Sequence, residues 1–233
     1  MNLLKSMLFL AFFSISLFSF SQKTTIQESK FTLGLFSGYN RGLGFNLNFT
    51  ALKPIESLPL HFRFGLGYTS LDPGNSADAR RIFINNATNG VPEEKGKSFD
   101  YRLDFMWKHD ILNLEESYIV FGPRYSSFTA NFNYIGGNED FDVTSKQFGL
   151  GIGAETQFKI SDKFNLAAAI GLGYFFNNTL KGHDTSYSPD DDNVNPRDDN
   201  QNNNTQFTYT DANKAIKQPS LMPRVLLGVV YKL

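Results

Sequence analysis

The sequence predicts an all-β protein, an eight-stranded antiparallel transmembrane up-and-down β-barrel. Three observations support this fold class. About eight segments place apolar side chains at every second position, and most of them have about the 9 to 11 residues that a tilted strand needs to cross a bilayer. The apolar faces of these segments carry no charge. A soluble sandwich also has alternating strands, so the chemistry of the two faces has to separate the two classes.

The eight predicted strands follow one another from the end of a polar leader to the end of the chain. Soluble strands usually have about 5 or 6 residues, so most of these segments are long. Their approximate spans are Phe31 to Tyr39, Leu43 to Ala51, Leu60 to Tyr68, Phe99 to Trp107, Tyr118 to Ser127, Phe148 to Phe158, Phe164 to Phe175 and Leu221 to Leu233.

The connections alternate between two kinds. The first strand turns into the second at "NRG", and the sixth turns into the seventh at "KISDK". If the chain starts in the periplasm, the second, fourth and sixth connections are short to medium and periplasmic. The opposite side carries long connections, among them "NFNYIGGNEDFDVTSKQ" and extracellular loops at about 70–98 and 177–220. Short inner turns with long outer loops are typical of outer-membrane barrels.

The predicted outward face is apolar and has aromatic residues towards both strand ends. Tyrosine and tryptophan favour the headgroup level of a bilayer, because each has an apolar body and a polar tip. A soluble core gives no reason for such sorting. The predicted outer belt contains Tyr39, Tyr68, Tyr101, Tyr125 and Tyr174, and the inner belt contains Phe49, Trp107, Phe158 and Tyr231.

The opposite face carries glycine, alanine and polar residues, as in "GLGIGAE". Glycine weakens a strand unless close packing demands it. Inside a small closed barrel, glycines leave room for long polar side chains from other strands. In lipid every backbone N–H and C=O must be paired within the protein, which also requires closure of the sheet. "GLGIGAE" is not a dinucleotide-binding motif, because its spacing is GxGxG and no helix follows.

The N-terminal stretch "MNLLKSMLFLAFFSISLFSFSQ" is typical of a secretory signal peptide. It has Lys5 before an apolar run and a small-x-small site at residues 19–21. We predict a cleaved signal peptide at 1–21, a periplasmic leader at 22–30 and the barrel at 31–233. An uncleaved anchor helix is the alternative, and the apolar run is shorter than the ~20 residues that such a helix needs.

Charge and cysteine content exclude several function classes. The formal net charge is -1, so there is no basic excess for binding nucleic acid. The chain has no cysteine, which excludes disulfides, thiolate metal sites and a cysteine nucleophile.

Charged residues on the inward face predict a lumen filled by its own side chains. Opposite charges on neighbouring strands predict that Asp104 meets Arg63 and that Asp100 meets Arg102 or Arg124. For Glu155 the predicted partner is Arg224 or Arg63. An ion pathway is the functional alternative, but eight strands leave an interior only wide enough for side chains. The predicted charge network is Arg63, Asp100, Arg102, Asp104, Arg124, Glu155 and Arg224.

An Asp- and Asn-rich stretch, "SPDDDNVNPRDDNQNNN", lies in the last long loop. Asp190 and Asp192 have the alternating spacing that begins a calcium loop, and Asp198 is positioned to complete a hard-cation site. The glycine and the terminal glutamate of an EF-hand are missing. A solvated acidic loop is the alternative interpretation, and we predict no resident metal or cofactor.

The strand pattern and the ending "PSLMPRVLLGVVYKL" resemble small bacterial outer-membrane β-barrels. The resemblance is to the outer membrane protein beta-barrel domain family, which is PorT-like, and more distantly to the OmpA and OmpX barrels. In that family the last strand is an assembly signal with an aromatic third from the end and an aromatic terminus. Tyr231 matches, whereas Leu233 stands where phenylalanine is more usual.

We therefore expect a non-enzymatic protein of the cell outer membrane, a structural or accessory subunit of an outer-membrane assembly. Its expected contacts are outer-membrane lipid, lipopolysaccharide and a larger outer-membrane complex. A narrow pore and an adhesin or cation-binding surface protein are the alternatives. A lipid A-modifying enzyme would need a serine nucleophile with a histidine base at the outer leaflet, where His61 is not expected.

Overall fold

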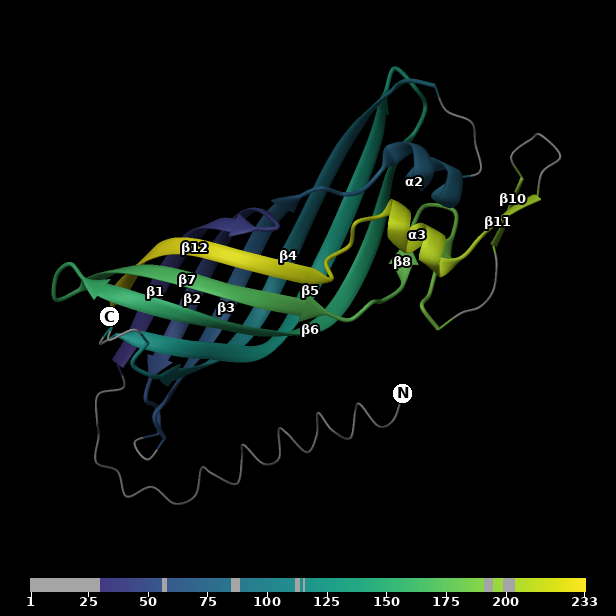
Figure 1. Cartoon of the computed structure of the whole chain (residues 1–233). Coiled ribbons are helices and arrows are strands. Elements are labelled where there is room, and N and C mark those ends of the chain that lie inside the picture. The colour runs from purple at the N-terminus through teal and green to yellow at the C-terminus, as the bar shows by residue number, and fades with distance from the viewer. Residues whose placement is uncertain are drawn as a thin grey trace.

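The eight predicted strands form one closed antiparallel sheet in the computed structural model (Figure 1). The structure describes residues 30–55, 58–84, 89–111, 114, 116–190, 195–198 and 204–233. The predicted signal peptide and all but the last residue of the leader lie outside these ranges. The barrel strands are β1 (Lys30–Asn40), β2 (Gly42–Leu52), β3 (Leu60–Leu71), β4 (Val91–Lys108), β5 (Ser117–Ile135), β6 (Asp140–Lys159), β7 (Phe164–Phe175) and β12 (Leu221–Lys232).

The barrel closes because its first and last strands pair. β1 and β12 are antiparallel in the register of Leu35 opposite Val229, and the remaining neighbours are consecutive strands along the wall. Pro123 interrupts the β4–β5 ladder, which resumes at Phe105 opposite Phe121 in the register that it had before the interruption. This is the eight-stranded, up-and-down architecture of transmembrane barrels.

Alternation of burial along the strands confirms the two predicted faces. In β2, Leu43, Phe45 and Leu47 are exposed, whereas the polar residues between them, Asn46 and Asn48, are buried. Three tyrosines at the outer rim, Tyr68, Tyr101 and Tyr125, lie next to aromatic neighbours on adjacent strands, and the ring centroids of Tyr101 and Tyr125 are 6.1 Å apart. A band of exposed apolar side chains therefore encircles the barrel.

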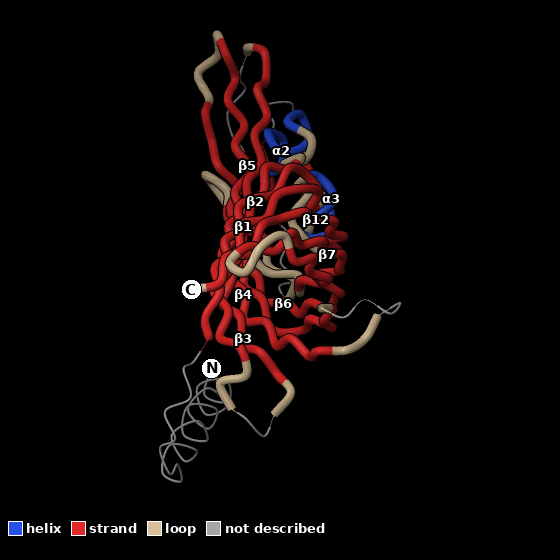
Figure 2. The backbone as a smooth tube through the Cα atoms, turned by 90° about the vertical axis from the view of Figure 1, so that its left-hand side faces the viewer, coloured by secondary structure: helices blue, strands red, loops and turns tan. Residues whose placement is uncertain are grey.

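Three strands are much longer than predicted. β4, β5 and β6 have 18, 19 and 20 residues, whereas the other barrel strands have 11 or 12. They project as a curved wall beyond the rest of the barrel (Figures 1 and 2). The segment "NFNYIGGNEDFDVTSKQ", predicted as a loop, is mostly strand, and the outer part of β4 lies within the predicted loop at 70–98. Only residues 136–139 connect β5 to β6.

Along the projecting wall, inward and outward side chains still alternate, but the outward face becomes polar and the inward face becomes apolar. Beyond Tyr125 the outward positions of β5 become polar, as at Thr129 and Asn131. The inward positions become apolar at the same level. In β5 these buried residues are Phe128, Ala130, Phe132 and Tyr134.

Two short helices pack against the inward face of this wall. They are α2 (Ser76–Phe83) and α3 (Tyr209–Ala215), from the two longest outer connections. The same connections contain β8 (Leu180–Lys181), β9 (Ser186–Tyr187), β10 (Asn195–Asp198) and β11 (Asn204–Phe207). No helix in the described ranges is long and apolar enough to span a membrane.

The helices and the wall share one apolar core, which we call the cap cluster. Most of its side chains are fully buried, and none of the contributing helices or hairpins could bury this surface alone. Its members are Leu71, Ala79, Ile82, Phe83, Ile84, Phe128, Ala130, Phe132, Tyr134, Phe141, Val143, Phe175, Leu180, Tyr187, Ala212, Ala215, Ile216 and Met222.

Hydrogen bonds fix the cap to the wall. The Tyr134 hydroxyl donates to the carbonyl of Ser76 at 2.8 Å, and Gln147 donates its side-chain amide to the carbonyl of Pro219 at 2.7 Å. Gly74 has φ +125° and lies against the backbone of Ala215, where a Cβ would overlap the carbonyl oxygen. Glycine is therefore required at this helix-to-helix contact.

Candidate functional site

The predicted charge network lies inside the barrel. The strand alternation turns all seven residues inward, and six of them are buried to 6% exposure or less. Arg224 is the exception, because it keeps intermediate exposure on the lumen side of β12. The network lies between the cap cluster and the inner end of the barrel.

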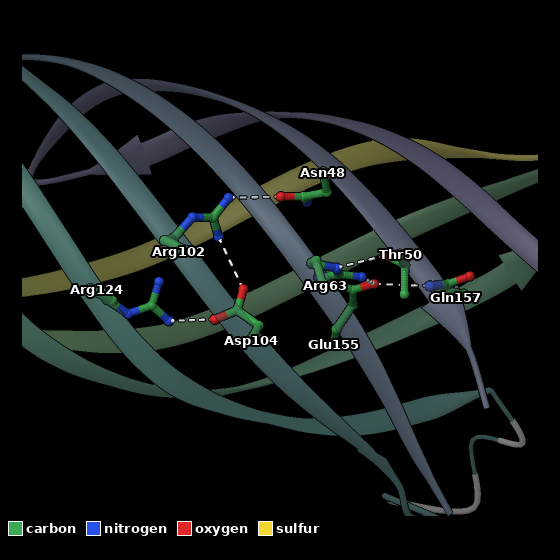
Figure 3. Close-up of polar contacts among 8 residues, drawn as sticks. All are labelled: Asn48, Thr50, Arg63, Arg102, Asp104, Arg124, Glu155 and Gln157. Atoms are coloured by element: carbon green, nitrogen blue, oxygen red, sulfur yellow. Dashed lines mark hydrogen bonds and ion pairs between the residues drawn. The ribbon is translucent and has the colours of Figure 1, made fainter. Parts of the chain in front are cut away.

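A bidentate ion pair crosses the inner half of the lumen from β3 to β6. The two terminal nitrogens of Arg63 donate to the carboxylate oxygens of Glu155 at 2.6 and 2.8 Å (Figure 3). Arg63 Nε also donates to the hydroxyl of Thr50 at 3.1 Å, and Gln157 donates to Glu155 at 2.9 Å. This pair is buried and extensively hydrogen-bonded, which is the geometry that offsets the desolvation of two charges.

A second group lies nearer the cap, where one carboxylate serves two arginines. Asp104 is 3.6 Å from Arg102 and 3.3 Å from Arg124 (Figure 3). Arg102 also donates to Asn48 Oδ1 at 2.8 Å. Asp104 is fully buried at 0% exposure, so these ion pairs lie out of contact with bulk solvent.

Asp100 and Arg224 have different surroundings from those predicted. The carboxylate of Asp100 accepts a hydrogen bond from Ser98 at 2.7 Å, and Ser98 in turn contacts Ser126 at 2.7 Å. Among the described residues, neither Asp100 nor Arg224 forms an ion pair. Arg224 instead lies in the wall of two small lumen cavities.

The predicted pairings are therefore partly wrong. Arg63 and Asp104 are opposite each other in the β3–β4 register, but Arg63 reaches across the barrel to Glu155. Glu155 has one of its two predicted partners, Arg63. Asp100 bonds to serine and not to an arginine. In so narrow a barrel a long side chain can reach a residue on the far wall as easily as a residue on the adjacent strand. The order of strands in the sequence identifies only the adjacent strand.

Glycines on the inner face make room for the arginines, as predicted. The Arg124 side chain lies directly on Gly151, where a Cβ would overlap the guanidinium. A Cβ on Gly65 would lie 2.7 Å from Nη2 of Arg102. The glycine repeat therefore positions the arginines by leaving space for them.

Apolar side chains fill much of the remaining lumen. Phe36 is 1% exposed and packs with Ala167, Leu226 and Val230. Met106, Tyr118 and Val120 form a second small cluster. Four of these residues, Phe36, Met106, Val120 and Leu226, are apolar exceptions on an inward face of mostly small and polar residues. Their packing leaves lumen cavities of about 20 and 10 Å³, and about 10–15 Å³ is needed for one water.

His61 and His183 lie at opposite ends of the barrel. His61 is buried near the inner end of β3, where its Nδ1 accepts the backbone N–H of Lys53 at 2.9 Å. His183 contacts Asp184 at 2.6 Å in the outer connection. The partners of these two histidines are thus a backbone amide and a carboxylate. Within the described ranges no group of three or more His, Asp or Glu is arranged to hold a metal ion.

The predicted cation loop lies largely outside the described residues. Asp190 is exposed in a turn after β9, and Asp192 falls outside the described ranges. Of Asp198 only the backbone is described, in β10. Calcium binding by this loop therefore stays a prediction.

A solved outer-membrane protein shares the barrel fold of this chain. A major outer membrane protein from Thermus thermophilus covers 89% of this chain and 100% of its own, with a TM-score of 0.71 and 23% identity. The match to Neisserial surface protein A (NspA) covers 88% of this chain and 95% of NspA, with 14% identity and a TM-score of 0.37. The match to Acinetobacter baumannii CarO covers 91% of this chain and 100% of CarO, with 12% identity and a TM-score of 0.40. No protein-family model and no curated protein matches the chain.

Proposed function

We propose that this chain is an integral protein of a bacterial outer membrane that neither conducts solutes nor catalyses a reaction. Its role is that of a structural or accessory subunit, which presents the projecting wall and the cap at the cell surface. The observation that carries this proposal is a lumen filled with side chains and covered by the cap cluster at one end.

The outward face supports insertion into lipid. Residues such as Leu35, Leu47, Ile152 and Leu227 are half or more exposed although they are large and apolar. A continuous apolar surface of this size on a water-soluble monomer would promote association. In a membrane the same surface contacts lipid and the outer rim contacts lipopolysaccharide, with the cap on the extracellular side and the C-terminus in the periplasm.

The filled lumen argues against the pore. Cavities of about 20 and 10 Å³ are each of the size of one or two waters, and ion-paired and apolar side chains line them. Purified protein reconstituted in a planar bilayer is therefore expected to give no conductance above background. Regular single-channel steps would contradict the proposal.

The projecting wall supports a binding role. Its outward face is polar, yet Val91 and Ile135, which face each other at the outer tip of the wall where the β4–β5 ladder ends, are 72% and 59% exposed. The PorT-like resemblance of the strand pattern agrees with an accessory subunit. An adhesin that binds through the same tip is the second candidate, and this projection favours it.

Cross-linking in native membranes separates the two candidates. Photo-cross-linkers placed at Ile135 are expected to capture a protein of the same outer membrane, whereas an identical probe at Ile160, in a periplasmic turn, serves as the control. Capture of only host-surface or matrix components would favour the adhesin. Recovery of the isolated barrel from both positions would contradict the accessory role.

A further inference from the structure

The charges that line the lumen do not balance. Between the inner end of the barrel and the cap cluster there are four arginines and three carboxylates, which leaves one positive charge in excess. These residues are Arg63, Arg102, Arg124 and Arg224, with Asp100, Asp104 and Glu155.

The excess charge lies in the half of the network nearer the cap. Glu155 is fully engaged by Arg63, and Asp104 is shared between Arg102 and Arg124. Arg224 has no carboxylate within ion-pair distance among the described residues. Arg224 is only partly exposed, and a cationic group with limited access to water and no counter-charge is unfavourable.

The arginines also have unused donors that are buried. The Nε atoms of Arg102 and Arg124 have no hydrogen-bond partner, although Arg102 is 5% and Arg124 is 4% exposed. The larger cavity, of about 20 Å³, is lined by Arg102 and Arg224, and the smaller one, of about 10 Å³, by these two and Arg124. Arg102 and Arg224 therefore line both cavities, and Arg124 joins them at the smaller one, beside the carboxylate of Asp100. The larger cavity is also lined by the ion-paired groups of Arg63, Asp104 and Glu155.

We propose that the lumen binds one monovalent, monoatomic anion, chloride, among Arg102, Arg124 and Arg224. One negative charge neutralises the excess and gives the buried donors an acceptor. The cavity volumes admit an ion of about the size of water and exclude larger oxyanions. This proposal rests on the lumen alone and does not depend on the cellular role.

Unfolding in matched salts tests the site. Detergent-solubilised protein is exchanged into sodium gluconate, whose anion is too large for either cavity, and titrated with sodium chloride at constant ionic strength. A ligand that binds only the folded state at about ten times its dissociation constant lowers the unfolding equilibrium constant about elevenfold. We expect this saturable change in the wild type and its loss in Arg224→Gln.

The matched control is Arg81→Gln, which removes an exposed arginine of α2 and should keep the full chloride response. Equal stability of the wild type in chloride and gluconate would overturn the proposal. So would a chloride response that Arg224→Gln retains, because the ion would then act elsewhere.

A second measurement on the wild type keeps the proposal testable if Arg224→Gln does not fold. Crystals grown in bromide are expected to show one anomalous peak in the lumen beside Arg102 and Arg224. A lumen that contains only water, with bromide confined to the surface or absent, would overturn the proposal.

Discussion

The lumen of this barrel depends on residues that occupy almost no space. Gly151 is opposite Gly173 in the β6–β7 register, and both face inward. The two glycines differ in what lies above them, because the Arg124 guanidinium covers Gly151 whereas Gly173 has only ordinary contacts at 3.5 Å and beyond. Substitution of these two paired glycines therefore separates the effect of lost packing space, at Gly151, from the effect of strand propensity, which both positions share.

Gly151→Ala is expected to destabilise the barrel by about 1–3 kcal/mol, since the added methyl group displaces Arg124 from Asp104. Gly173→Ala is the matched control and should change stability by less than about 0.5 kcal/mol. The free energy of unfolding is measured by urea titration in detergent, with the mobility shift between folded and unfolded forms on a gel. Equal effects at the two positions would show that Arg124 can move at no cost.

For the buried Arg63–Glu155 pair, removing one charge is expected to cost more stability than removing both. Glu155→Gln leaves Arg63 uncompensated and should cost about 3–5 kcal/mol. The double variant Arg63→Met with Glu155→Gln should recover most of that loss, because it removes the unpaired charge as well. Urea titration again gives the free energies.

The exposed pair of Lys95 and Glu93, 3.0 Å apart, provides the control for charge removal as such. Glu93→Gln should change stability by less than about 1 kcal/mol, as is usual for surface pairs. A double variant in the lumen that is no more stable than Glu155→Gln would mean that lost packing, and not the unpaired charge, dominates.

At the scale of elements, the outer cap is held by short helices whose ends are fixed by side chains. α3 begins with a capping box, in which the Thr208 N–H donates to the Asp211 carboxylate at 2.9 Å and the Asp211 N–H donates to the Thr208 hydroxyl oxygen at 3.4 Å. The backbone hydrogen bond from Thr208 keeps the pKa of Asp211 below its ordinary value. A helix of 7 residues has little stability of its own, so this cap matters.

The sign of the resulting pH dependence follows from that lowered pKa. The ionised carboxylate is favoured in the folded cap, so its contribution is complete above the ordinary pKa of about 3.9 and is lost as pH falls through the lowered value. Hydrogen-exchange protection of the Ala212 and Ile216 amides should therefore decrease below about pH 4. Asp211→Asn should remove this pH dependence, and an unchanged pH profile in that variant would contradict the assignment.

The strands themselves were predictable wherever one face is apolar throughout. All eight were found, together with the turn at Ser161 to Lys163. The outer halves of β4, β5 and β6 escape the prediction because it rests on an apolar outward face, and above Tyr125 that face becomes polar. The signal was present at Phe128, Ala130 and Phe132, where period-two alternation continues with the apolar residues on the other face.

At the scale of the whole molecule, closure of the barrel decides which charges meet. The inward-facing residues could be identified from the sequence, because alternation is local. The assignment of Glu155 to Arg63 alone could not, because β3 and β6 become neighbours only across a lumen. Asp104 instead pairs with Arg102 of its own strand and Arg124 of the adjacent strand, since Arg63 is engaged elsewhere. The cap could not be predicted from the sequence either, because its core joins two connections that are distant along the chain.

The position of the barrel in the bilayer is testable through its single tryptophan. Trp107 is 46% exposed near the inner end of the outward face, in the predicted inner belt. In the proposed membrane orientation its indole lies at the headgroup level, so its fluorescence should be quenched most by lipids brominated close to the ester groups. Lipids brominated at the chain ends should quench it less.

A tryptophan moved along the same face provides the control. Leu103 lies four positions away on β4 and is also exposed. At a rise of about 3.4 Å per residue and a tilt of about 40°, this distance corresponds to about 10 Å along the membrane normal. In the variant Trp107→Phe with Leu103→Trp, the order of quenching should reverse, with deep bromines most effective. If neither tryptophan is quenched by any brominated lipid, the apolar band does not contact lipid, and the exposed face must instead be covered by protein.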